Sequence, residues 1–133
     1  MVGHLSWSRL GVGRYRLVLD GPTGRIEAIG RDWFDALVAI RLRVEPTGWS
    51  ICVQGARRDT YPSGMQRDTG AQRVYLQVLG EEVQREPWSG PGSRMPSTFA
   101  DADPADLGTV AEQAEYHRRW RASMWARHSD TAH

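Results

Sequence analysis

The segment over residues 55–70 holds the densest group of side chains suited to binding a partner. It is polar, is punctuated by proline and glycine, and is longer than a tight hairpin requires. Arginine and tyrosine are among the residue types that dominate binding in protein interfaces. The candidate partner-binding residues are Arg57, Arg58, Asp59, Tyr61, Arg67 and Arg73. In the alternative interpretation, the arginines and aspartates pair with one another and only hold the loop in place.

A second candidate surface is the polar face of a predicted sheet. Arginines alternate with apolar residues along the strands that flank a turn over residues 20–24, and a tyrosine is placed on the same face by a later strand. The residues of this face are Arg14, Arg16, Arg25 and Tyr75. Such a face can bind nucleic acid or a phosphate ligand through ion pairs and stacking. The net charge of +1 and the presence of Glu27 argue against this use.

No recognised catalytic or metal-binding motif occurs in the sequence. Ser63 follows a proline and lacks the Gly-x-Ser-x-Gly pattern, so we expect a turn residue. Cys52 falls in a predicted strand, where a lone cysteine usually packs as a small apolar side chain. We therefore favour a non-catalytic protein without a cofactor or metal. A cryptic enzyme that uses Cys52, His117 or Asp59 is the third hypothesis.

The composition is that of an ordinary globular protein. Of 133 residues, 40% are hydrophobic and 25% are charged. All seventeen basic residues are arginine, as expected from codon bias in a GC-rich bacterial genome. No apolar stretch is long enough to span a bilayer, and no secretory signal is visible. With a single cysteine, the chain cannot form an internal disulfide, and we expect a cytoplasmic protein.

Apolar periodicity and capping residues predict the order ββαββ-loop-α. Strands are predicted over residues 14–19, 25–29, 49–56 and 73–79, and helices over residues 33–45 and 110–127. Asp32 is placed to cap the first helix, and Thr109 and Glu112 form a capping box for the second. Arg41 falls on the apolar side of the first helix. We expect it to extend its head to solvent, the alternative being a buried ion pair.

The simplest packing of these elements is an α+β fold with a four-stranded antiparallel sheet and two helices on one face. Residues 1–12 are interpreted as a flexible N-terminal lead-in and residues 13–127 as a single domain. Residues 86–98 are interpreted as a mobile loop rich in proline and glycine, and residues 128–133 as a C-terminal tail.

These observations favour a small, non-catalytic protein-binding module. Inhibitor, immunity and adaptor proteins of bacterial systems have this size and lack catalytic motifs, and the partner expected here is another protein. Nucleic acid is the alternative partner, and no membrane association is expected. An exposed sheet face would also allow a homodimer.

Overall fold

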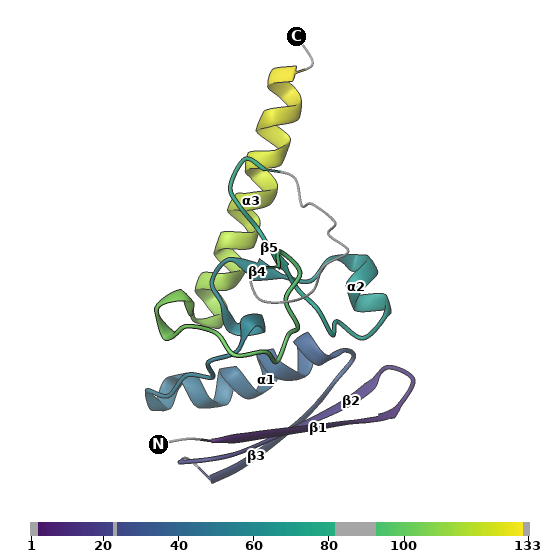
Figure 1. Ribbon diagram of the computed structural model, residues 1–133, viewed down its shortest axis with the longest axis vertical. Coiled ribbons are helices and arrows are strands. Elements are labelled where there is room, and N and C mark those ends of the chain that lie inside the picture. The colour runs from purple at the N-terminus through teal and green to yellow at the C-terminus, as the bar shows by residue number, and fades with distance from the viewer. Residues whose placement is uncertain (1–2, 23, 82–92, 132–133) are drawn as a thin grey trace. The chain divides into compact units, whose positions relative to one another are not determined.

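The computed structural model describes residues 3–22, 24–81 and 93–131 (Figure 1). The chain divides into two compact units. Unit 1 contains residues 1–51 and 62–72, and unit 2 contains residues 52–61 and 73–133. Within the described residues the fold is α+β, with a three-stranded antiparallel sheet, a two-stranded sheet and three α-helices. The assignment of residues 13–127 to a single domain stays a prediction.

Unit 1 contains the three-stranded sheet, with strand order β1–β2–β3. The strands are β1 (His4–Gly11), β2 (Arg14–Gly21) and β3 (Gly24–Gly30). Both pairings are antiparallel, and Leu17 of β2 lies between Trp7 of β1 and Ala28 of β3. The predicted hairpin of β2 and β3 is confirmed, because the alternating sequence of β2 and a dense turn sequence specify it locally.

The prediction of a flexible lead-in over residues 1–12 is wrong for most of that segment. Strand β1 lies there and pairs with β2 along its length, with a register shift between Arg9 and Gly11. Nearly all of its side chains are exposed, including those of Ser6 and Ser8. An edge strand that buries little side-chain surface needs no strict apolar alternation, so its period is hard to recognise.

Helix α1 (Trp33–Val44) packs against β2 and β3. Its start is held by carboxylates, as predicted. The Oδ1 atom of Asp32 accepts a hydrogen bond from the Asp35 amide at 2.7 Å, and the Oδ2 atom of Asp35 accepts one from the Arg31 amide at 2.9 Å. These bonds satisfy amides that have no partner within the helix. A Cβ atom on Gly30 would lie 2.4 Å from the Ala36 nitrogen, so glycine permits the close approach of β3 to α1.

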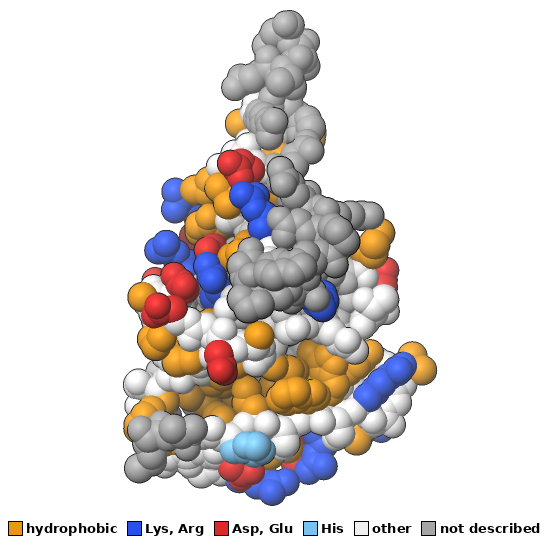
Figure 2. Space-filling model, viewed as in Figure 1, with side chains coloured by type: hydrophobic (Ala, Val, Ile, Leu, Met, Phe, Trp, Pro, Cys, Tyr) orange, Lys and Arg blue, Asp and Glu red, His pale blue; other side chains and the backbone are white. Residues whose placement is uncertain are grey.

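The interior of unit 1 is formed by one face of the sheet and one side of α1. Its buried apolar side chains include Leu17, Leu19, Ile26, Phe34, Leu37 and Ile40. Other large apolar side chains remain exposed in this unit, among them Trp7, Leu42 and Trp49. Figure 2 shows hydrophobic side chains gathered at the surface over α1 and the sheet. The two-layer arrangement therefore buries the centre of the sheet and leaves apolar surface around it.

Arg41 is buried rather than extended to solvent. Its side chain has no exposed surface, and its Nε atom lies 3.0 Å from the Oε2 atom of Glu45, one helical turn later. Burial lowers the pKa of the Arg41 guanidinium, and the carboxylate of Glu45 opposes that shift. The prediction that Arg41 reaches solvent is wrong, because a carboxylate within reach on the same helix compensates the buried charge.

Residues 62–72 return to unit 1 and carry the short helix α2 (Gly64–Asp68). Ser63 caps α2 and forms a reciprocal capping box with Gln66, which confirms its expected role in a turn. The Trp33 amide donates a hydrogen bond to the Gly70 carbonyl at 2.8 Å. The segment therefore supplies an acceptor for the first turn of α1.

Unit 2 contains the two-stranded sheet of β4 (Thr60–Tyr61) and β5 (Tyr75–Leu76), together with helix α3 (Val110–Thr131). Short 3₁₀ helices lie at Glu45–Thr47 in unit 1 and at Gln54–Ala56 and Pro104–Asp106 in unit 2. The Thr109–Glu112 capping box of α3 is confirmed. Within the ranges described, no helix combines the length and the apolar character needed to cross a membrane.

The predicted four-stranded sheet is not formed. Residues 49–56 form no strand, and within residues 73–79 only Tyr75–Leu76 is a strand, paired with β4. The amides of Gln54 and Gly55 instead donate to the carbonyls of Ala100 and Thr98, both at 2.8 Å. A loop therefore satisfies the backbone groups that a strand ladder would otherwise pair.

Two predictions about loops and termini need correction. Residues 86–92 of the predicted mobile loop lie outside the described residues. Residues 93–98 are held in place, because the carbonyls of Arg94 and Pro96 accept hydrogen bonds from Leu76 and Val74. Helix α3 continues to Thr131, so residues 128–131 do not form the predicted tail, and residues 132–133 lie outside the described residues.

Candidate partner-binding site

The six predicted partner-binding residues are divided between the two units. Arg67 belongs to unit 1, and the other five residues belong to unit 2. Arg67 lies with its Nη1 atom 2.9 Å from the Oδ2 atom of Asp32 and with its guanidinium 5.2 Å from the centre of the Phe34 ring. This arginine therefore fastens α2 to the start of α1 in its own unit.

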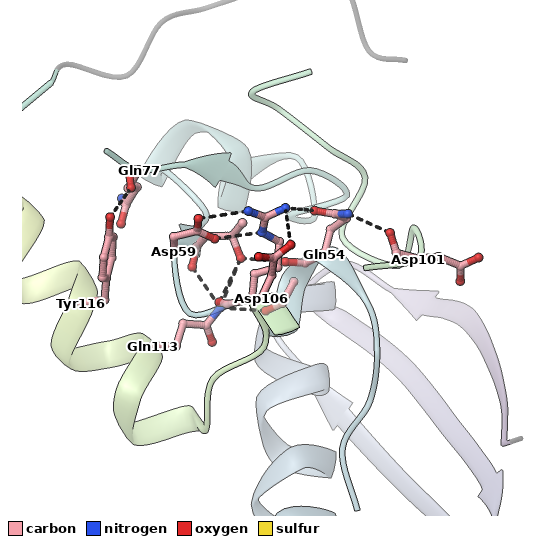
Figure 3. A network of polar contacts seen from close by, with 10 residues as sticks. Gln54, Asp59, Gln77, Asp101, Asp106, Gln113 and Tyr116 are labelled. Carbon is pink, nitrogen blue, oxygen red and sulfur yellow. Dashed lines mark hydrogen bonds and ion pairs between the residues drawn. The ribbon is translucent and has the colours of Figure 1, made fainter. Parts of the chain in front are cut away.

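Arg57 lies at the centre of a polar network in unit 2, part of which is drawn in Figure 3. Its Nε and Nη2 atoms donate to the two carboxylate oxygens of Asp59 at 2.8 and 3.0 Å. Its Nη1 atom lies 3.4 Å from the Gln54 side-chain oxygen and 3.7 Å from an Asp106 carboxylate oxygen. The hydrogen bond to Asp59 raises the pKa of Arg57. We call Arg57, Asp59, Gln54 and Asp106 the Arg57 network. The guanidinium of Arg57 is therefore bound within the protein.

Helix α3 is fastened to the same region through Gln113, whose side chain is 2% exposed. Its Nε2 atom donates to the carbonyls of Gly55 and Thr60 at 2.8 and 2.9 Å. The Tyr116 hydroxyl donates to the Gln77 carbonyl at 2.8 Å. Figure 3 shows Gln113 and Tyr116 on α3, with Tyr116 extending to Gln77. Buried backbone carbonyls thus find donors on the helix.

Arg58 differs from its neighbour Arg57 because its side chain is exposed. Its guanidinium lies 5.9 Å from the centre of the Tyr116 ring, in cation–π geometry. It forms no ion pair with any described residue. Burial and the charge of Asp59 raise the pKa of Tyr116, while Arg58 and Arg119 lower it. Arg58, Tyr116 and Arg119 therefore share one neighbourhood, which we call the Arg58 patch.

The other two predicted residues of unit 2 serve packing and backbone contacts. The ring of Tyr61 stacks on His117 with centroids 3.8 Å apart, and His117 is 6.1 Å from Trp120. The Nη1 atom of Arg73 donates to the Met95 carbonyl at 2.8 Å. Tyr61 therefore joins β4 to α3, and Arg73 holds residue 95 beside β5.

The second candidate surface lacks one of its predicted members. Tyr75 lies in β5, outside the three-stranded sheet, and is 8% exposed, so its placement beside Arg14, Arg16 and Arg25 is wrong. The three arginines do share the face of the sheet opposite α1. Two acidic residues lie on the same face. Asp20 is opposite Arg25 in the register, and Glu27 accepts hydrogen bonds from Arg16 at 2.7 and 3.1 Å. Carboxylates thus neutralise much of this face.

The candidate catalytic residues do not assemble into a recognisable centre. Cys52 is exposed and lies outside any strand, so the prediction of a packed strand cysteine is wrong. In the part of the chain that the structure describes, no three His, Cys, Asp or Glu side chains are grouped as metal ligands. The Nδ1 atom of His117 lies 3.2 Å from the Gln77 side-chain oxygen.

No protein-family model matches the chain, and no curated protein matches it significantly. The geometry of the molecule is therefore the basis for assigning a function. Sequence reasoning missed Tyr116 and Arg119 as site residues. Their spacing of three positions, on the helix that follows the Thr109 cap, was the signal available for placing them together.

Proposed function

We propose that this protein is a small, non-catalytic, cytoplasmic module that binds another protein through the Arg58 patch. The observation that carries the proposal is the contrast between two adjacent arginines. The guanidinium of Arg57 is held by Asp59 within the chain, whereas that of Arg58 is exposed and rests over Tyr116. Arginine and tyrosine together are characteristic of the residues that contribute most to interface binding.

The chemistry of the patch favours an acidic partner. A guanidinium that lies over an aromatic ring keeps its N–H groups available to donate to both oxygens of a carboxylate in a bidentate arrangement. Arg119 is exposed and adds a second positive charge near Tyr116. Stacking on the ring also restricts the Arg58 side chain before binding, which lowers the entropy lost when a complex forms.

The Arg57 network acts as the support for this surface. It fixes the segment over residues 54–60, while Gln113 and Tyr116 fix α3 beside that segment. Asp59 and Tyr61 belong to the same support through their contacts with Arg57 and His117. We therefore assign binding to Arg58 and positioning to its neighbours, a division that the sequence does not make.

The experiment uses a matched pair of charge reversals, Arg58→Glu and Arg14→Glu. The partner is captured from native lysate after nuclease treatment, identified, and purified, and its affinity for each variant is measured. We expect Arg58→Glu to weaken binding by about 30-fold or more, as at an interface hot spot, because it repels an acidic partner. Arg14→Glu should bind within about twofold of the wild type, because Arg14 belongs to the other unit and is not part of the Arg58 patch.

Both exposed arginines can be replaced with little effect on folding, and the thermal midpoints check this point. Arg57→Glu is not a suitable variant, because its new carboxylate would face Asp59 and Asp106. Unchanged affinity of Arg58→Glu would contradict the proposal. Loss of capture on nuclease treatment, with weaker binding by Arg14→Glu, would instead support the nucleic-acid hypothesis.

A further inference from the structure

Strand β1 has an unpaired edge. It is the first strand in the order β1–β2–β3, and in the described residues it pairs with β2 alone. At eight residues it is longer than many edge strands, and its outer side presents a row of backbone donors and acceptors. This edge belongs to unit 1, whereas the Arg58 patch belongs to unit 2. The two surfaces can therefore be tested independently.

The edge lacks the features that usually prevent strand pairing between molecules. Between His4 and Arg9 the strand has no proline, lysine or carboxylate. The register shift that could twist the edge away comes only after Arg9. The Arg9 guanidinium lies 5.8 Å from the Tyr15 ring centre of the same chain. The segment from His4 to Arg9 is therefore open to pairing.

One face of the edge is also apolar. The register places Leu5 and Trp7 opposite Leu19 and Leu17, on the face that α1 covers over β2 and β3. Helix α1 packs mainly against those two strands, and Trp7 remains 51% exposed. A strand added beside β1 would bury more of this tryptophan and extend the sheet in one step.

We propose that the occupant of this edge is β1 of a second copy, paired antiparallel about a twofold axis at Trp7. In that register Trp7 lies opposite Trp7 of the other copy, and aromatic pairs of this kind stabilise neighbouring strands. Leu5 lies opposite Arg9, and Ser6 lies opposite Ser8. The two tryptophans then meet on one face, where each Leu5 lies beside the aliphatic stem of an Arg9, and hydroxyl groups meet on the other face.

The charge on the edge does not prevent pairing with a second copy. Arg9 is its one residue charged at all pH values, and it faces Leu5 rather than the other Arg9. The two Arg9 residues are offset by four positions, which separates their Cα atoms by about 14 Å. That distance exceeds the Debye length of about 8 Å at physiological salt, so their repulsion is largely screened. A twofold dimer uses the same surface of both copies, so β1 alone can form the whole contact.

Sedimentation velocity of the full chain tests the dimer between about 1 and 300 μM. We expect a concentration-dependent dimer whose dissociation constant rises at least about tenfold in Trp7→Lys, since an inward-pointing lysine blocks edge pairing. The matched control is Leu42→Lys, which alters an exposed leucine of α1 and should leave the dissociation constant unchanged. A wild-type protein that stays monomeric, or a dimer insensitive to Trp7→Lys, would overturn the proposal.

Cysteine cross-linking tests the register while keeping Trp7. In a Cys52→Ser background, an equal mixture of Ser6→Cys and Ser8→Cys proteins should form disulfide-linked dimers under mild oxidation. Directly opposed residues have Cα atoms about 4.5 to 5.5 Å apart, within the range of a disulfide. Each variant alone should cross-link several-fold less, because its cysteines lie diagonally. Equal yields from the mixture and the separate variants would exclude this register.

Discussion

The interior of unit 1 consists mainly of aliphatic and aromatic side chains, whereas unit 2 buries amides and hydroxyls among loops. Leu17, Leu37 and Ile40 have no exposed surface in unit 1, and Thr60 and Gln113 are at most 2% exposed in unit 2. A sheet and a helix satisfy their own backbone groups, so side chains between them are free to be apolar. The loops of unit 2 leave carbonyls in need of donors, and buried polar side chains supply them.

The largest effect is expected from removing apolar volume in unit 1. Leu37→Ala should lower the free energy of unfolding by about 3 kcal/mol, because it deletes buried methyl groups and leaves a cavity. Urea denaturation measures the change. Leu42→Ala is the control on the same helix, since Leu42 is 58% exposed and its loss should cost less than about 0.5 kcal/mol. Similar losses in both variants would show that burial against the sheet does not govern this unit.

A smaller loss is expected when unit 2 loses a buried donor without losing volume. Gln113→Leu keeps the size of the side chain but leaves the Gly55 and Thr60 carbonyls without the Nε2 donor. We expect the free energy of unfolding to fall by about 2 kcal/mol, the cost of unsatisfied buried groups. The control is Gln72→Leu at an exposed position. Increased stability in Gln113→Leu would mean that unit 2 tolerates an apolar interior as unit 1 does.

The smallest effect concerns the pH dependence at the cap of α3. The Thr109 amide and hydroxyl, together with the charge of Arg58, hold the pKa of Glu112 below its usual value. This contribution to stability is present above the unfolded-state pKa and is lost as the pH falls through the folded-state pKa. Wild type should therefore lose slightly more stability than Glu112→Gln between about pH 5 and pH 3. Urea midpoints at both pH values give the comparison, and equal losses would exclude a stabilising carboxylate.

The same difference between the units explains which elements the sequence predicts. In β2 the alternating residues Leu17 and Leu19 are buried, and at α1 the Asp32 cap marks the start, so local patterns suffice for these elements. Residues 49–56 also alternate, and Ile51 and Val53 are indeed buried. However, the amides of Gln54 and Gly55 donate to the carbonyls of Ala100 and Thr98, in a loop far along the chain. A local sequence pattern cannot predict a hydrogen-bond partner so far along the chain.

The candidate site shows a similar limit. The arginines at positions 57 and 58 are adjacent and belong to the same polar segment, so composition assigns them the same role. Only the fold places one beside Asp59 and the other over Tyr116. The residue types of the surface were predictable because arginine and tyrosine cluster in residues 57–61. The division into supporting and exposed side chains depends on α3, which lies far along the chain.

The alternation of the chain between the two units has a consequence for how the molecule can be rearranged. The backbone passes from one unit to the other after residues 51, 61 and 72, so no single cut separates them. A fragment ending at residue 51 would lack the Gly70 carbonyl that bonds to Trp33 and the Arg67 side chain that pairs with Asp32. A single truncation that keeps all of one unit also keeps a segment of the other, because residues 1–72 include 52–61 and residues 52–133 include 62–72. Neither unit can therefore be transferred alone by a single truncation.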